Sequence, residues 1–225
     1  MMTGMYATVA VLAALTHRDR TGEGKHIDMA LLDVQVAMLA NMASNYHTSG
    51  EAPKRWGNAH ANIMPYQTFA CVDGHIIVAT GNDIQYQKFV TAGGRVELGT
   101  WNLELATDAR FATNALRVQQ RAVLVPLLDA MVLLRPRAEW IAMLEAVGVP
   151  CGPINDDADV FKNPQVKARG LTVDIAHPTA GKVTLVRSPM TLSATPTRFD
   201  KAPPLLGQHT DDVLRDVLGR CAPQG

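Results

Sequence analysis

The first stretch of the sequence is apolar on every side. Met5 to Leu15 (MYATVAVLAAL) holds almost no polar residue, and the chain then turns polar at His17-Arg18-Asp19-Arg20. This pattern predicts a helix, with Thr3 as a candidate N-cap. A helix that is apolar all round needs other elements to cover it, and almost nothing precedes this one. We therefore expect the sequence to begin inside a larger protein.

The period of the pattern then changes twice. Residues 25–30 (KHIDMA) alternate as a short strand does, and 31–46 present the wide apolar face of one helix. Two β-rich runs, Tyr66–Val72 and His75–Ala79, flank Asp73-Gly74. An Asp-Gly pair between two such runs strongly predicts a β-hairpin.

The rest of the chain is predicted to be mainly helical, with one further strand pair. Asp83 is a candidate N-cap, and Gly148 with Pro150 beyond it gives a regular helix stop. Residues 151–155 (CGPIN) are expected to form a turn-rich loop. Strands are expected at 171–175 and 182–186, and helices at 84–92, 114–134, 137–147, 156–161, 164–169 and 211–218. The order of these elements predicts a mixed α/β chain.

Composition narrows the class of protein. Of the 225 residues 47% are hydrophobic, which argues against disorder, and 21 basic residues balance 21 acidic ones. A formal net charge of zero argues against a nucleic-acid binder and a basic membrane-surface module. The longest apolar run is too short to span a bilayer. The cysteines Cys71, Cys151 and Cys221 are sparse, and the histidines lack metal-site spacing. We expect a soluble cytoplasmic protein with no bound metal or resident cofactor.

Two loops could carry chemistry. Arg55-Trp56-Gly57-Asn58-Ala59-His60 combines a cation, an amide, an imidazole and a flexible backbone, which suits a carboxylate or phosphate. Spacing alone favours an ordinary solvated loop there. Gly81-Asn82-Asp83-Ile84-Gln85 lies where a strand meets a helix, and a simple capped turn explains it equally well. Cys151 has no neighbouring histidine or cation in sequence and is not expected to be a nucleophile.

Seven segments together carry a more specific signal, because they occur in the order found in one family. The segments are Thr3–Ala7, Arg20–Gly24, Leu31–Asp33, Arg55–His60 with Pro65–Gln67, Asp73-Gly74, Gly148–Pro153 and Pro204–Thr210. In that order the chain resembles the family III CoA-transferases, the CaiB/BaiF or formyl-CoA transferase group. The run Arg55–Gln67 is most similar to the succinyl-CoA:glutarate (hydroxymethylglutarate) branch.

The resemblance implies transfer of CoA between an acyl-CoA and a carboxylic acid, through an aspartyl-CoA thioester. Coenzyme A thioesters are then substrates rather than cofactors, and the full-length parent is expected to be a homodimer. The family's catalytic aspartate lies just ahead of the segment that begins at Thr3, a position that falls before Met1. No catalytic residue is therefore assigned in this chain, which is expected to be inactive alone. Two alternatives are an α-methylacyl-CoA racemase and a non-catalytic fragment that acts only by association.

The resemblance also implies a domain plan and a set of contacts. Residues 1–51 would end the first half of a large domain, 52–160 form an α+β small domain, and 161–225 return to the large domain. The parallel-sheet N-terminal half would be absent. Substrate contacts are expected at Arg55, Gly57, Asn58 and His60, with weaker candidates at Gly81, Asn82 and Gln85.

Overall fold

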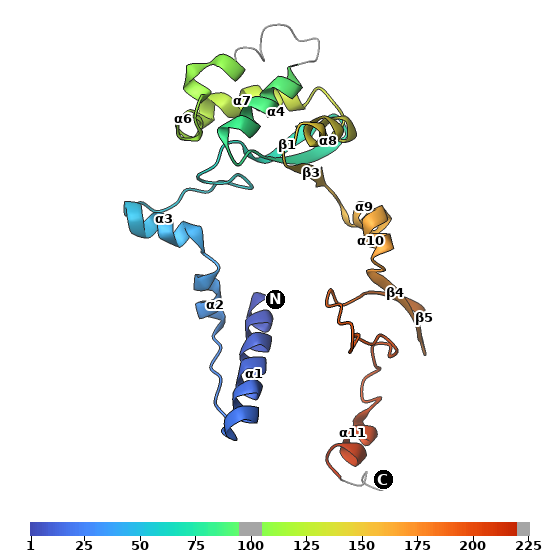
Figure 1. The fold of residues 1–225 in the computed structure, drawn as a ribbon. Coiled ribbons are helices and arrows are strands. Elements are labelled where there is room, and N and C mark those ends of the chain that lie inside the picture. The colour runs from blue at the N-terminus through green and yellow to red at the C-terminus, as the bar shows by residue number, and fades with distance from the viewer. Residues whose placement is uncertain (95–104, 220–225) are drawn as a thin grey trace. The chain divides into compact units, whose positions relative to one another are not determined.

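The computed structural model describes residues 1–94 and 105–219 (Figure 1). These residues divide into two compact units, the first spanning Met1–Asn62 and the second beginning at Ile63. Cys221 lies outside the described residues. The division falls eleven residues beyond the predicted boundary at 51/52, and the predicted domain limits stay a prediction.

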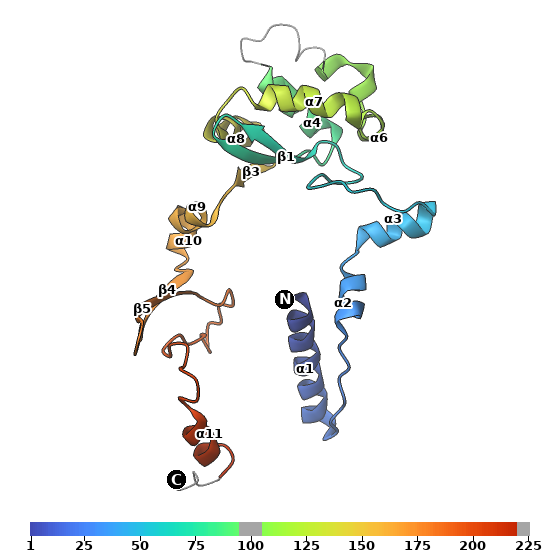
Figure 2. The same ribbon diagram turned by 180° about the vertical axis from the view of Figure 1, so that it is seen from behind.

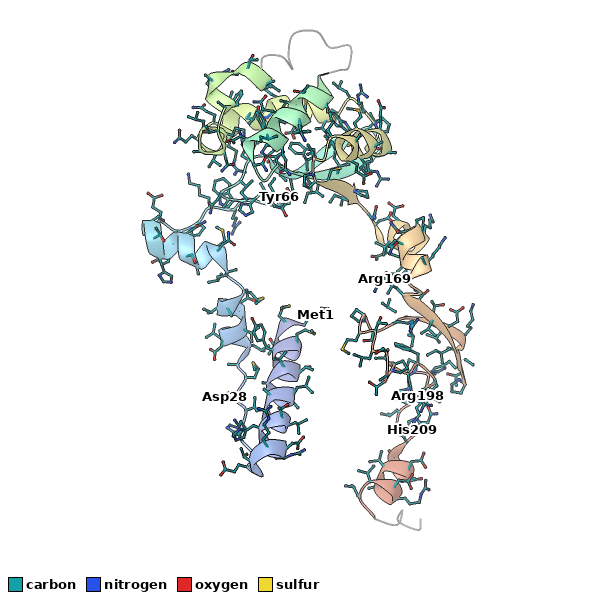
Figure 3. All side chains as sticks on the ribbon, viewed as in Figure 1. Met1, Asp28, Tyr66, Arg169, Arg198 and His209 are labelled. Carbon is teal, nitrogen blue, oxygen red and sulfur yellow. The ribbon has the colours of Figure 1, made fainter. Side chains whose placement is uncertain are left out.

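The first unit holds three helices, α1 (Met2–Thr21), α2 (Leu31–Ala37) and α3 (Asn41–Ser49). The predicted α1 is confirmed and ends at Gly22, whose φ of +78° suits glycine. The predicted cap at Thr3 is wrong, because the N-cap position is Met1 and no side chain caps the helix. No residue of α1 is buried, and Figure 3 shows side chains projecting around it.

Two predictions for the first unit are wrong. Residues 25–30, all within the described part of the chain, form no strand, because no other segment of this unit pairs with them. The single helix predicted over 31–46 is broken between α2 and α3. At the break Ala40 has a φ of +45°, outside the helical region, and Met42 N–H donates to the Leu39 carbonyl instead of continuing the helix.

The second unit contains a three-stranded antiparallel sheet in the order β1-β2-β3. Strands β1 (Tyr66–Cys71) and β2 (Gly74–Ala79) form the predicted hairpin. Its two-residue turn is Val72-Asp73, one position before the predicted Asp73-Gly74, and Gly74 begins β2 with a φ of +146°. The loop predicted at 151–155 is wrong, because Cys151–Ile154 is strand β3, paired with β2. Pro153 is tolerated there because β3 is an edge strand.

Helices α4 (Asp83–Gly93), α7 (Arg121–Val132) and α8 (Arg137–Ala146) pack with this sheet (Figures 1 and 2). The helix predicted over 114–134 is interrupted at Gln120, which separates α6 (Asn114–Gln119) from α7. A short 3-10 turn, Ala109–Phe111, precedes α6. The largest fully buried apolar side chains of this core are Trp140, Tyr86, Phe69, Phe89, Phe111, Met64, Ile76, Leu124, Leu128 and Leu144.

The remaining elements follow the predictions closely. They are α9 (Asp157–Lys162), α10 (Pro164–Ala168), the hairpin β4 (Thr172–His177) and β5 (Gly181–Val186), and α11 (Thr210–Asp216). Gly148, with a φ of +72°, follows α8 as its predicted stop. The mixed α/β class is confirmed.

Candidate functional site

The loop Arg55–His60 makes a tight turn in the first unit. The Ala59 N–H donates to the Trp56 carbonyl over 3.1 Å, and Gly57 inside this turn has a φ of +61°. Only glycine enters that left-handed region at little cost. A Cβ at Gly57 would meet no atom within 4 Å, so backbone conformation rather than crowding favours glycine. The turn leaves Arg55, Gly57 and Asn58 exposed and His60 half-buried.

The end of this loop is held by amide groups. The Asn62 N–H donates to Nδ1 of His60 over 3.1 Å, so a neutral His60 ring carries its proton on Nε2. The side chains of Asn45 on α3 and Asn62 exchange two hydrogen bonds, of 3.1 and 3.3 Å. This Asn45–Asn62 pair ties the loop back to α3. It was not anticipated from sequence, because nothing in the local pattern links residues 17 positions apart.

A groove of about 550 Å³ runs between α3 and the segment leading into the loop. Its walls combine hydroxyl and amide groups with apolar side chains, one indole ring, one ammonium group and one carboxylate. The residues that line it are Met42, Ser44, Asn45, Thr48, Ser49, Glu51, Ala52, Pro53, Lys54, Trp56, Ala61 and Asn62. Such walls offer both hydrogen-bonding groups and apolar surface to a ligand.

The Arg55 guanidinium is the exposed cation of the turn. Across residues 1–94 and 105–219, no carboxylate lies within ion-pair distance of Arg55. Arg110 and Arg215, by contrast, each form a close pair with a neighbouring aspartate. A guanidinium binds a carboxylate through two parallel hydrogen bonds. An exposed guanidinium such as that of Arg55 has the chemistry to bind a carboxylate.

The second candidate set lies in the other unit, at the start of α4. The prediction that Asp83 caps this helix is wrong: the N-cap is Asn82, whose side chain accepts from the Gln85 N–H over 2.9 Å. The Gln85 Oε1 in turn accepts from the Gly81 N–H over 2.7 Å. This reciprocal arrangement is a capping box shifted by one residue. Gly81, Asn82 and Gln85 come together, and those bonds serve the helix end.

Asp83 instead meets a buried cation that sequence reasoning missed. Its carboxylate lies 2.7 Å from Nη2 of Arg117, a residue of α6 with 0% exposure. The same guanidinium donates to the carbonyls of Met64 (2.7 Å) and Phe111 (2.9 Å) and lies over the Tyr86 ring at 4.3 Å. These partners are spread along the chain, so no local motif could have revealed them.

Neither described cysteine is tuned for nucleophilic attack. Burial, reinforced by the negative charge of Glu145, raises the pKa of the Cys151 thiol. Burial is also the main reason that the pKa of Cys71 is raised, with Asp73 adding to it. A raised pKa lowers the thiolate fraction at neutral pH. Within the described residues no three His, Cys, Asp or Glu side chains are grouped to hold a metal ion.

Comparison with known proteins identifies the family. The model of CoA-transferase family III matches residues 1–210. The chain belongs to CoA-transferase family III. Among family members, the chain is 41% identical over 217 residues to the succinate–glutarate CoA-transferase of Agrobacterium fabrum, covering 96% of this chain and 52% of that protein. It is also 41% identical over 218 residues to the mouse succinyl-CoA:glutarate CoA-transferase, covering 97% and 48%.

A solved family structure agrees with the fold. A CaiB/BaiF family protein from Brucella suis superposes with a TM-score of 0.77 at 44% identity, covering 96% of this chain and 54% of that one. The chain therefore spans about half the length of the relatives it matches. None of the described helices combines the length and apolar composition needed to cross a bilayer.

Proposed function

We propose that this chain contributes to a family III CoA-transferase that moves CoA between succinyl-CoA and a dicarboxylic acid such as glutarate. The observation that carries the proposal is the match across residues 1–210 together with 41% identity to relatives named for succinate and glutarate. The exposed Arg55 on a glycine turn supports it, because a dicarboxylate has a second carboxylate to be bound.

The chemistry that the family resemblance implies is covalent catalysis by a carboxylate. An aspartate attacks the acyl carbon of the donor, the CoA thiolate leaves, and a mixed anhydride forms. The thiolate then attacks the aspartyl carbonyl and releases the donor acid, which leaves an aspartyl-CoA thioester. The acceptor repeats these steps in reverse and leaves as its CoA thioester. The site must stabilise tetrahedral oxyanions and keep water from the anhydride.

The nucleophile of this scheme is not supplied by residues 1–225. The family resemblance places the aspartate before Met1, ahead of the segment that begins at Thr3, and the first carboxylate along the chain is Asp19. We infer that a longer chain or a second polypeptide provides it. The 225 residues would contribute the substrate loop: Arg55 for the distal carboxylate, Asn58 and His60 for acyl or lid contacts, and Gly57 for close backbone approach.

The test is an assay of CoA exchange between succinyl-CoA and glutarate. We expect no turnover from the 225-residue chain alone and clear turnover once the in-frame coding sequence upstream is included. Hydroxylamine added with succinyl-CoA should then trap the upstream aspartate as a hydroxamate, detected by mass spectrometry. Turnover by the 225 residues unaided, or an active longer protein with no trapped aspartate, contradicts the proposal.

The role of Arg55 has its own test in the active protein. Arg55→Ala should raise the glutarate KM about tenfold, roughly 1.4 kcal/mol, with kcat little changed, because the contact holds ground state and transition state alike. Arg55→Lys should recover only part of this loss, since lysine lacks the planar fork. The matched control is Arg169→Ala, which removes an exposed arginine of the other unit. A glutarate KM that stays unchanged in Arg55→Ala removes that role.

A further inference from the structure

Arg117 is a fully buried charge that the proposed chemistry does not use. Its side chain is 0% exposed, whereas that of its partner Asp83 is 48% exposed. Removing a guanidinium from water is costly, and a buried ion pair is weak evidence for stability, because apolar residues of similar volume often serve as well. The pair does fix the orientation of its partners, because a planar guanidinium with fixed donors holds them in one geometry.

One contact of Arg117 falls on the segment that follows the candidate loop. Nε donates to the carbonyl of Met64, and Asn114, three residues earlier on α6, accepts from the N–H of the same Met64 over 2.9 Å. Both backbone groups of Met64 are thus fixed by α6. Met64 follows His60 by four positions, so the short segment after the candidate loop is anchored at Met64.

The same guanidinium also fixes the start of α4. Nη2 meets Asp83, and Thr80 donates twice to the carbonyl of Pro65, from its N–H (2.9 Å) and its Oγ1 (2.8 Å). The segment Thr80–Asp83 is therefore tied to Met64–Pro65 through Arg117 and Thr80. The buried guanidinium of Arg117 therefore links Met64 to the segment that holds the candidate residues Gly81 and Asn82.

We propose that Arg117, with Asp83, is a positioning residue for substrate binding. Arg117 fixes Met64, which follows the Arg55–His60 loop by four positions. Through this anchor it would hold the loop that is proposed to bind the acceptor acid. This inference rests on the proposed function, because it concerns the same loop. If Arg117 served stability alone, an apolar residue of similar size would serve as well, and acceptor binding would not respond.

The first experiment does not depend on catalysis. Hydrogen exchange in the 225-residue chain is measured at the amides of Met64, Thr80, Gly81 and Gln85, each hydrogen-bonded in the wild type. Asp83→Asn should speed exchange at these amides about tenfold and leave the β1–β2 hairpin unchanged. Asp73→Asn is the matched control: its carboxylate is 47% exposed and also pairs with an arginine, Arg137.

The second experiment is kinetic and uses the active longer protein. Arg117→Met and Asp83→Asn should raise the glutarate KM about threefold to tenfold with kcat within twofold, and Arg117→Lys should restore part of the loss. Asp73→Asn should leave KM unchanged. If Arg117→Met does not fold, the Asp83→Asn comparison still decides the question.

The outcomes separate the two proposals. Faster exchange confined to the four amides, together with a raised KM, supports positioning. Asp83→Asn behaving like Asp73→Asn in either experiment overturns it. If the wild-type longer protein shows no exchange between succinyl-CoA and glutarate, the proposed function fails, while hydrogen exchange still decides whether Arg117 fixes these segments.

Discussion

The first 62 residues and the segment from Met64 to Ile154 are built in opposite ways. The later segment encloses a continuous core in which Trp140, Phe89 and Leu144 are fully buried. In residues 1–62, all of which the structure describes, Val34 is the only buried residue. The difference teaches that helix α1, with Val9 64% and Leu12 59% exposed, is not stabilised by burial within its own unit. Relatives twice as long have further chain that could cover such a helix.

The largest effect is expected when one indole is removed from each region, because this tests how much burial stabilises each of them. Trp140→Ala should lower the free energy of unfolding by about 3–5 kcal/mol, because it opens a cavity and removes the bond from Nε1 to the Val132 carbonyl. Trp56→Ala, at a 36% exposed ring, should change it by less than about 0.5 kcal/mol. Urea unfolding followed by circular dichroism measures both. Equal effects would show that the buried core does not hold the second unit together.

A smaller change removes one buried hydroxyl. Tyr86→Phe leaves the Leu105 carbonyl without its 3.1 Å donor and should cost about 1–2 kcal/mol in the same assay. Tyr6→Phe, on the exposed α1, is the control and should be neutral. Burial also raises the pKa of Tyr86, so this phenol should resist ionisation in an alkaline absorbance titration of the folded protein. Ionisation of Tyr86 at the ordinary tyrosine value of 10.0 would contradict its burial.

The next prediction tests whether additional chain covers the exposed side chains of α1. Leu12→Ala in the 225-residue chain should change the free energy of unfolding by no more than about 0.5 kcal/mol, since Leu12 is already exposed. In the active longer protein the same substitution should cost about 2 kcal/mol or more, because the side chain would then be buried. Thermal unfolding of the two forms, with and without the substitution, measures the difference. The same small effect in both would mean that the additional chain does not cover α1.

The smallest expected effect concerns the β4–β5 hairpin. Hydrogen bonds from Lys182 and Thr184 to the Asp174 carboxylate hold its pKa below the ordinary value of 3.8. A depressed folded-state pKa contributes stability that is present above the ordinary value and is lost as pH falls through the folded one. An NMR titration of the Asp174 carboxyl should place its midpoint below 3.8, and Lys182→Met should move the midpoint upward. An unchanged midpoint in Lys182→Met would contradict this coupling.

The parts of the fold that sequence predicted best are those set by neighbouring residues. The hairpin turn, predicted one residue too late at Asp73-Gly74, and the helix stop at Gly148 both depend on residues only a few positions apart, each with a glycine at positive φ. Predictions failed where distant contacts decide. Strand β3 depends on β2, more than 70 positions earlier, and its Gly152-Pro153 pair is typical of a turn. The alternation at 25–30 is compatible with a strand, but no partner strand meets it.

For the candidate site too, local patterns were predictable from sequence and distant contacts were not. The loop around Gly57 and the helix start after Gly81 were predicted because both are local patterns, but the capping role was given to Asp83 instead of Asn82. Arg117 was missed because its partners stand 34 and 53 positions away, at Asp83 and Met64. A charged residue on an amphipathic helix is usually solvated, so no local pattern indicates that Arg117 is buried.

The place of β3 at the end of the order β1-β2-β3 has a consequence for synthesis of the protein. The β1–β2 hairpin can form as soon as residues 66–79 have left the ribosome. Strand β2 cannot pair with β3 until Ile154 has also emerged. During that interval the backbone groups of His75–Val78 form an open strand edge, a template for pairing with other nascent chains. A stop codon after position 79 and before position 151 would leave this edge permanently open, so products that end there should aggregate.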